Sequence, residues 1–356
     1  PALGEGSAFS DNAGVAMLRS NAAGEDPREK IQAVLKYGTH GGYHGHFDRT
    51  ALNSLMRYGR SFYNPEHIWY SYPNFMYAFF VQTSLPHNMV VVDMKQQEPV
   101  ESRRLLFRTG DLMQATAVET RARWSPPPYG GIRYPWFTGE TFQDKCWDEG
   151  RYMPVPENEP AWGTMGAYSD RVTQRRLMAV TDEYVLLADY LEADEIHTFD
   201  CLFNIKGFRG LEAERQTLAR HTENMHPDPV LAAQLITDCD WYDATGTAKV
   251  SFETQFGEAA DNAGTRIHGL DGVLNMDVYS AWPREREVMI GTLPEAHWVN
   301  RKLWYTVKGD DRVLAEGQFG AWILGRAEID VSLEGVKKLT LTTRAEYKKD
   351  APTTLF

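Results

Sequence analysis

The sequence predicts an all-β protein built from stacked, mostly antiparallel sheets. Short runs of apolar and β-branched residues recur along its 356 residues, each bounded by polar or turn-forming residues. Turns rich in glycine, proline and aspartate separate these runs, which is typical of antiparallel sheets. We therefore expect a large stack of sheets, a β-supersandwich, followed by a smaller β-sandwich.

Most segments with a clear pattern are predicted to be strands. The clearest strands are Met89–Asp93, Tyr184–Asp189, Ala248–Glu253 and Lys338–Thr343. The segment Ala51–Phe62 is ambiguous, because its apolar residues fit either a helical stripe or a strand. The segment Leu211–Leu231 predicts the one helix, although Pro227 and Pro229 interrupt it.

Changes in composition divide the chain into three parts. A charged stretch at Asn204–Glu212 follows the first set of strands, and a polar run at Glu258–Gly264 marks a weaker boundary. We expect a β-sandwich in residues 1–205, a connecting segment with closing strands in 206–262, and a C-terminal β-sandwich in 263–356.

Charge and hydropathy exclude several classes of partner. The formal net charge is −12, which argues against nucleic acid, because phosphate binding needs a basic surface. A local basic cleft could still hold an acidic substrate. No segment reaches the roughly 20 apolar residues of a membrane helix, and the first residues do not resemble a signal peptide. The three cysteines show no metal-type spacing.

The segment Tyr37–Asp48 is the strongest candidate for chemistry. It contains His40, His44, His46 and Asp48 among several glycines. If the backbone is extended, the two imidazoles of His44 and His46 point to opposite sides. The pattern fits part of a metal site, a catalytic base, or a tight polar turn.

Further candidates lie downstream of this segment. His87 stands at the mouth of an apolar strand, where it could hold a metal or cap the strand by a hydrogen bond. Arg49, Arg57 and Arg60 could bind a carboxylate or sulfate in bidentate fashion, although the same spacing fits a solvated strand face. His40 could contact a substrate or form a hydrogen bond within its loop.

Three blocks of sequence, in this order, resemble the C-terminal half of the heparinase II/III-like polysaccharide lyases. Lys36–Asp48 is similar to that family's Gly-Gly-x-His-x-His-x-Asp segment. Pro86–Asp93, with Gln96 or Gln97 after it, is similar to its His-Asn-Thr-Val-x-Val-Asp-Gly strand. Arg175–Leu191, with His197 and Asp200 beyond, resembles its third pattern. The blocks cover residues 10–205.

The resemblance implies a lyase that cleaves uronate-containing acidic polysaccharides, such as glycosaminoglycan, alginate or ulvan, by β-elimination. It implies that His44 is the catalytic residue. It further implies that His46 and His87 bind a structural zinc, with Asn64 at the position of the third ligand. His40, Arg49 and Tyr72 are the predicted substrate contacts. A periplasmic or secreted location and a possible homo-oligomer are expected.

The sequence departs from the family pattern in two places. Asn64 stands where the family has an aspartate, and a neutral amide is a poorer zinc ligand, so Asn64 binds weakly, Glu66 substitutes, or the metal is absent. The family's N-terminal α/α toroid, which supplies a catalytic tyrosine, is expected to be absent from this chain. A missing N-terminal domain or a second chain would then complete the site.

Other interpretations remain open. A non-catalytic carbohydrate-binding or assembly protein could retain the lyase sandwich. A metal-dependent hydrolase using His40, His44, His46 and Asp48 lacks an evident base. Near the end, Leu303–Gly317 and Ala327–Leu341 resemble a galactose-binding-like carbohydrate module, or alternatively the closing sheet of the lyase.

Overall fold

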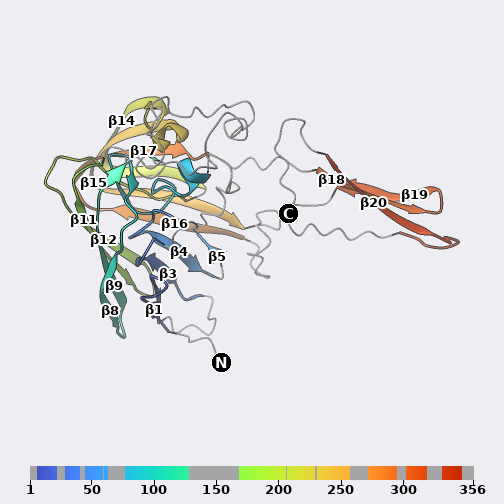
Figure 1. Cartoon of the computed structure of the whole chain (residues 1–356), viewed down its shortest axis with the longest axis horizontal. Coiled ribbons are helices and arrows are strands. Elements are labelled where there is room, and N and C mark those ends of the chain that lie inside the picture. Colours follow the sequence, from blue (N-terminus) through green and yellow to red (C-terminus); the bar gives the residue numbers. More distant parts are fainter. Residues whose placement is uncertain are drawn as a thin grey trace.

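The fold is all-β with antiparallel pairing throughout (Figure 1), as the sequence predicts. The computed structural model describes residues 6–21, 29–40, 45–58, 60–62, 77–127, 168–205, 207–228, 231–256, 272–294, 302–318 and 331–346. All four clearest predicted strands are confirmed, since they overlap β6 (Val90–Val92), β12 (Val185–Glu192), β15 (Thr237–Phe256) and β20 (Leu339–Glu346). Among the described residues, no helix is long and apolar enough to cross a membrane.

The first sheet is a meander in which each strand pairs with the next along the chain. Its strands are β1 (Ala8–Ser10), β2 (Val15–Arg19), β3 (Gln32–Lys36), β4 (Leu52–Arg57) and β5 (Arg60–Ser61). The ambiguous segment Ala51–Phe62 therefore forms strands, since β4 finds a hydrogen-bonded partner in β3. Along β2 and β3 every second residue is buried, which is the alternation of a half-buried strand.

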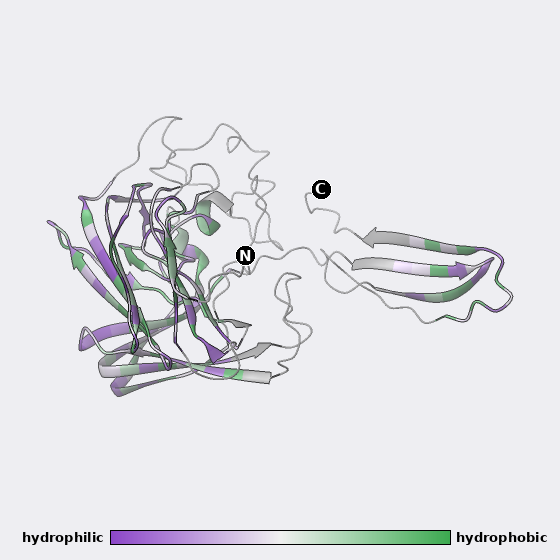
Figure 2. Ribbon diagram, turned by 90° about the horizontal axis from the view of Figure 1, so that it is seen from below, coloured by the Kyte–Doolittle hydropathy of each residue, from purple (hydrophilic) through white to green (hydrophobic). Residues whose placement is uncertain are grey.

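A second sheet packs against the first and closes the sandwich. Its order is β12-β11-β9-β8, with the bounds β8 (Arg103–Thr109), β9 (Gln114–Ala122), β11 (Val172–Val180) and β12 (Val185–Glu192). Along β9 every second residue is buried, and Figure 2 shows hydrophobic and hydrophilic residues side by side along the strands of the chain. The two inner faces meet in one core of Ala16, Leu18, Ile31, Ala33, Leu35, Tyr37, Leu52, Val118, Met178 and Val180.

Two short strand pairs connect this sandwich to the next core. The strand β6 (Val90–Val92) pairs with β13 (Phe199–Cys201), and β7 (Gln96–Gln97) pairs with β10 (Trp124–Ser125). A π-helical turn, η4 (Tyr77–Val81), precedes them. The second core contains apolar residues from these elements, from the segments beside them and from the strand β15 (Thr237–Phe256). Its members include Phe79, Phe80, Met89, Val91, Trp124 and Trp241.

The predicted helix at Leu211–Leu231 is wrong, because most of it belongs to the long strand β14 (Phe208–Asn224). Local residues such as Leu, Glu, Ala and Arg favour a helix. The pairing partner β15 (Thr237–Phe256) overrides this preference by offering hydrogen bonds along the length of β14. Only a short 3-10 turn, η7 (Ala232–Leu235), follows.

The long strand β15 also pairs with β16 (Gly272–Ser280) and β17 (Glu285–Thr292). One sheet therefore continues across the expected boundary between residues 262 and 263, because both strands after that boundary bond to a strand before it. In the described part of the C-terminal region, β18 (Lys302–Gly309), β19 (Arg312–Gln318) and β20 (Leu339–Glu346) form one three-stranded sheet (Figure 1).

Candidate functional site

The candidate site is the loop that leaves β3 and returns to β4, together with the segments that pack beneath it. Residues 37–40 and 45–48 of the predicted motif are described, and His46 in the second of these ranges contacts His87. The predicted catalytic residue His44, the predicted zinc ligand Asn64 and the predicted substrate contact Tyr72 lie outside the described residues.

His46 and His87 lie side by side, although they are 41 positions apart in the sequence. The Nδ1 atom of His46 is 3.0 Å from the Nε2 atom of His87, and the two rings are perpendicular. The Nδ1 atom of His87 lies 2.7 Å from the carbonyl oxygen of Thr83. A carbonyl only accepts, so His87 carries its proton on Nδ1 and directs the Nε2 lone pair at His46.

Both imidazoles are held in the neutral form. Burial, reinforced by His87, lowers the pKa of His46 to about 4. Burial also lowers the pKa of His87, despite the opposing charge of Asp48. Neutral imidazole is the form that binds metals.

The histidine pair fits two of the ligands of a zinc site. Two nitrogens bound to one tetrahedral zinc at about 2.0–2.1 Å would lie about 3.3 Å apart. The observed 3.0 Å is close to this value and equally suits a direct N–H···N hydrogen bond. Within the described residues, three or more His, Cys or carboxylate ligand atoms gather elsewhere, at Asp170, Glu195 and His197.

His40 lies inside the same loop, against the ring of Phe47, with ring centroids 4.4 Å apart. Burial, together with the nearby charge of Arg49, lowers the pKa of His40 to about 4. Its Nε2 atom is buried and has no hydrogen-bond partner among the described residues. A neutral imidazole with an unused ring nitrogen can accept or donate one further hydrogen bond, which is compatible with the predicted substrate contact.

Gly45 allows the two described parts of this loop to approach each other. A Cβ atom at Gly45 would lie 1.8 Å from the carbonyl oxygen of His40 and 2.8 Å from its Nδ1 atom. Only glycine fits this approach without a shift of the backbone. The glycine-rich composition of the motif therefore has a local steric cause at this position.

We expect Gly45→Ala to lower the free energy of unfolding by about 1–3 kcal/mol, the usual cost of forcing an extra methyl group into a packed site. Chemical denaturation of the two proteins measures the difference. Gly210→Ala is the matched control, since a Cβ atom at Gly210 meets nothing within 4 Å. Equal effects at the two positions would contradict the steric explanation.

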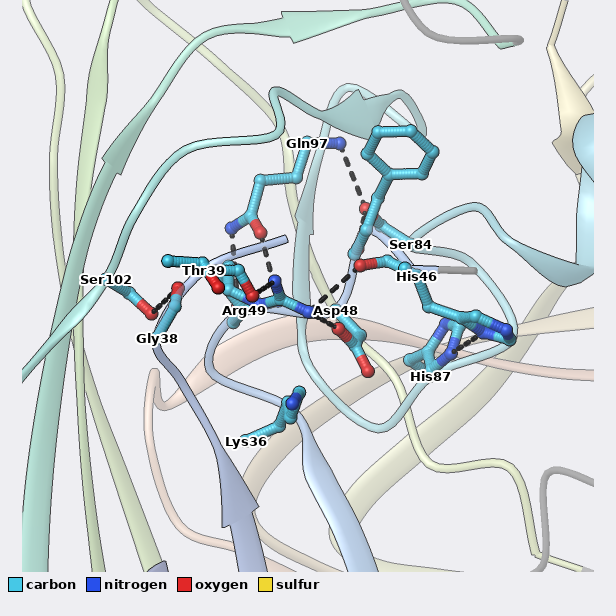
Figure 3. A network of polar contacts seen from close by, with 12 residues as sticks. Lys36, Gly38, Thr39, His46, Asp48, Arg49, Ser84, His87, Gln97 and Ser102 are labelled. Atoms are coloured by element: carbon cyan, nitrogen blue, oxygen red, sulfur yellow. Dashed lines mark hydrogen bonds and ion pairs between the residues drawn. The ribbon is translucent and has the colours of Figure 1, made fainter. Parts of the chain in front are cut away.

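Arg49 does not fit the predicted contact with substrate, because its side chain is buried and lies among Thr39, His46 and Asp48 (Figure 3). Its side chain is only 2% exposed. The guanidinium donates hydrogen bonds to the carbonyl oxygens of Thr39 and His46 and forms an ion pair with Asp48. Burial raises the pKa of Asp48, but Arg49 outweighs this and holds that pKa below its usual range.

Through Arg176, the third sequence block meets the second block and Thr50, which follows the first block. On β11 and β12, Arg176 lies directly opposite Asp189, and the two form a bidentate ion pair at 2.7 and 2.9 Å. The remaining nitrogen of Arg176 donates to the backbone carbonyls of Thr50 and Asn88. The sequence resemblance marked this block without indicating the pairing, which depends on strand register.

Sequence reasoning missed the role of His197. Its two ring nitrogens lie 2.8 Å from Asp93 and 2.6 Å from Asp170. Burial lowers the pKa of His197, but these two carboxylates outweigh it, so the pKa is raised overall. Asp93 ends the second block and His197 follows the third, so their positions beside the blocks were the available signal.

Four described residues of the candidate site support the loop between β3 and β4. The described residues supply a buried, charge-paired support: neutral His46 and His87 on one side, and the Arg49–Asp48 pair on the other. None of these four side chains is exposed. A proton-transferring group at this site would therefore have to be another residue, and the sequence predicts His44 for that role.

No family model and no curated protein matches the sequence. The similar solved structures include "Heparinase III-BT4657 gene product, Methylated Lysines", with 12% identity, a TM-score of 0.40, and coverage of 96% of this chain and 42% of that chain. "Crystal Structure of Heparinase III" has 12% identity, a TM-score of 0.39, and coverage of 97% and 42%.

A third similar structure is heparan sulfate lyase HepC from Pedobacter heparinus, with 12% identity, a TM-score of 0.39, and coverage of 87% of this chain and 39% of that chain. This chain spans about two fifths of the length of these structures. The likeness is a distant one in structure. It carries no argument about reaction or substrate.

Proposed function

We propose that this chain is the β-sandwich part of a polysaccharide lyase that cleaves uronate-containing acidic polysaccharides by β-elimination. In this reaction a base removes the proton at C5 of the uronate, negative charge spreads onto the carboxylate, and the C4–O bond breaks. The leaving oxygen then takes up a proton. His44 is the proposed catalytic residue in this chain, and His40 and Tyr72 are proposed substrate contacts.

The observation that carries the proposal is the convergence of the three sequence blocks. His46 of the first block contacts His87 of the second. Asn88 of the second block accepts a hydrogen bond from Arg176 of the third. Arg176 also donates to the carbonyl oxygen of Thr50, 126 positions away, so segments distant in the sequence meet beside this loop. The first block, which resembles part of a lyase active site, is therefore in contact with the second block, and the second block is in contact with the third.

The proposal includes a structural zinc held by His46 and His87. When bound, the ion would tie the loop after β3 to the segment before β6. Asn64 is the proposed third ligand, with Glu66 as its substitute. The ion has no assigned step in the reaction, because the proposed chemistry requires only a base and a proton donor.

The proposal also includes a partner. The family that the sequence resembles completes its site with an α/α toroid, and we infer that another region or a second chain supplies this half. The test therefore uses the protein together with any upstream region that its natural chain contains.

The test is incubation with a panel of uronate polymers while the ultraviolet absorbance of unsaturated uronate ends is followed. We expect a rising signal with at least one polymer, and its loss in His44→Ala with the fold intact by circular dichroism. The control is His221→Ala, since His221 is exposed on the distant strand β14. Binding of the polymers without any unsaturated product would instead favour a non-catalytic carbohydrate-binding protein.

Metal analysis tests the zinc separately. We expect about one equivalent of zinc in the purified protein and its loss in His87→Ala. Zinc far below one equivalent in the unaltered protein would reject the site. The short nitrogen–nitrogen distance would then be a plain hydrogen bond between His46 and His87.

A further inference from the structure

Gln97 forms an unusual two-way contact with the backbone of Arg49. The Arg49 amide donates to Oε1 of Gln97 at 3.1 Å, and Nε2 of Gln97 donates to the Arg49 carbonyl oxygen at 3.3 Å. The side-chain amide thus replaces the donor and acceptor that a neighbouring strand would offer. Neither glutamate, which only accepts, nor methionine can reproduce both bonds.

Gln174 sets the orientation of the Gln97 side-chain amide. Nε2 of Gln97 also donates to Oε1 of Gln174 at 3.2 Å, and Nε2 of Gln174 donates to the Val90 carbonyl oxygen at 3.0 Å. The backbone amide of Gln97 donates to the Ser84 hydroxyl. Both glutamines are buried, so water does not compete for these bonds.

Arg49, held in this way, bridges the two described parts of the motif loop (Figure 3). Its guanidinium donates to the carbonyl oxygen of Thr39 on one side and to that of His46 on the other. A single planar fork thereby fixes the distance between the two ends of segment 40–45. The ion pair with the Asp48 carboxylate compensates the positive charge of the buried Arg49 guanidinium.

We propose that Gln97 and Arg49 are positioning residues that fix Thr39 and His46, the described residues that precede and follow the predicted catalytic residue His44 in the sequence. This inference deepens the proposed lyase function and rests on it. Gln97 anchors the backbone of Arg49 to the sandwich, and Arg49 transmits that anchor to both ends of the loop. Neither side chain contacts substrate. Their effect is on the geometry of the reacting group, where a displacement of about 1 Å can cost about 100-fold in rate.

Gln96 provides a matched control. It lies next to Gln97 on the same short strand and is equally buried, at 1% exposure. Neither polar atom of its side-chain amide has a hydrogen-bond partner within the described structure. Gln96→Met and Gln97→Met therefore remove the same atoms from neighbouring buried positions, and only the second removes the contact with Arg49.

The experiment measures kcat and KM on the uronate polymer, together with hydrogen–deuterium exchange of residues 37–50. We expect Gln97→Met to lower kcat by about 10- to 100-fold with KM within about twofold, and to speed exchange in this segment. Gln96→Met is expected to change neither. Arg49→Lys keeps the positive charge beside Asp48 but loses the planar guanidinium, so we expect the same loss of kcat and the same faster exchange. This variant tests the inference if Gln97→Met does not fold.

Three results would overturn the inference. One is unchanged kcat and exchange in both Gln97→Met and Arg49→Lys. Another is an equal loss in Gln96→Met, which would show a general packing effect. The third is faster exchange with unchanged kcat, since the loop would then move without consequence for the reaction. If the unaltered protein cleaves no polymer, the lyase function fails by itself, and exchange alone decides whether Gln97 and Arg49 hold the loop.

Discussion

Replacing Arg176 by methionine is expected to lower the free energy of unfolding by about 1–3 kcal/mol, the usual cost of leaving buried hydrogen-bond acceptors without their donor. Arg176 is 1% exposed and binds Asp189 with two hydrogen bonds. Its removal would leave the Asp189 carboxylate without its partner and would take a donor from the carbonyls of Thr50 and Asn88. Denaturant unfolding, extrapolated to water, measures the loss.

Two further variants test whether the effect depends on the buried position of Arg176 and on its partner Asp189. Arg175→Met is the control, because Arg175 is the next residue on the strand but points outward to an exposed ion pair with Glu119, and its loss should be far smaller. The double variant Arg176→Met/Asp189→Leu should regain little stability, since the side chain of Asp189 is 20% exposed and the carbonyls of Thr50 and Asn88 still lack their donor. A single variant as stable as the unaltered protein would show that the pair contributes nothing.

Replacing Asp200 by asparagine is expected to stabilise the protein at neutral pH by up to about 3 kcal/mol. Asp200 lies on β13 opposite Val91, and its Oδ2 atom is buried without a hydrogen-bond partner in the described structure. Burial, followed by the charges of Asp93 and Glu287, raises the pKa of Asp200 to about 6. An amide of the same shape avoids the cost of burying this charge.

The sign of the effect depends on pH. A carboxyl group whose pKa is higher in the folded state stabilises that state below its unfolded pKa of about 3.9, and this contribution is lost as pH rises to about 6. Unaltered protein and Asp200→Asn should therefore be about equally stable near pH 4 and differ fully above about pH 7. Thermal unfolding across this range measures the difference.

Asp170→Asn serves as a control of opposite sign. Its hydrogen bond with His197 lowers the pKa of Asp170, so its ionised form stabilises the fold at neutral pH and loses this effect in acid. We expect this variant to be destabilised at neutral pH, with the difference shrinking as pH falls. A constant difference between unaltered protein and Asp200→Asn at every pH would contradict the raised pKa of Asp200.

The two segments whose local pattern was least clear show where sequence reasoning reached its limit. For Ala51–Phe62, both a helix and a strand satisfied the pattern, and pairing with β3 decided for β4. For Leu211–Leu231, residue preference favoured a helix, and the long partner β15 imposed a strand. In both cases a strand distant in sequence supplied the hydrogen bonds, which no local window contains.

The candidate site shows the same limit at the level of single residues. The motif correctly singled out His46 and His87 as neighbours, because their positions in the blocks implied a shared location. It assigned Arg49 to the substrate, whereas the fold turns that side chain inward to Thr39, His46 and Asp48. Whether an arginine faces solvent or core depends on the tertiary contacts of its segment, and here Gln97, 48 positions away, binds the backbone of Arg49.

By itself, the sequence determined the all-β class, the main strands and the loop that carries the candidate chemistry. These follow from local alternation, turn residues and a motif whose parts are contiguous. Only the tertiary structure decided which polar side chains support that loop and which can meet a ligand. Burial, register and hydrogen-bond partners depend on contacts between distant strands, as in the Gln97–Arg49 contact and the Arg176–Asp189 pair.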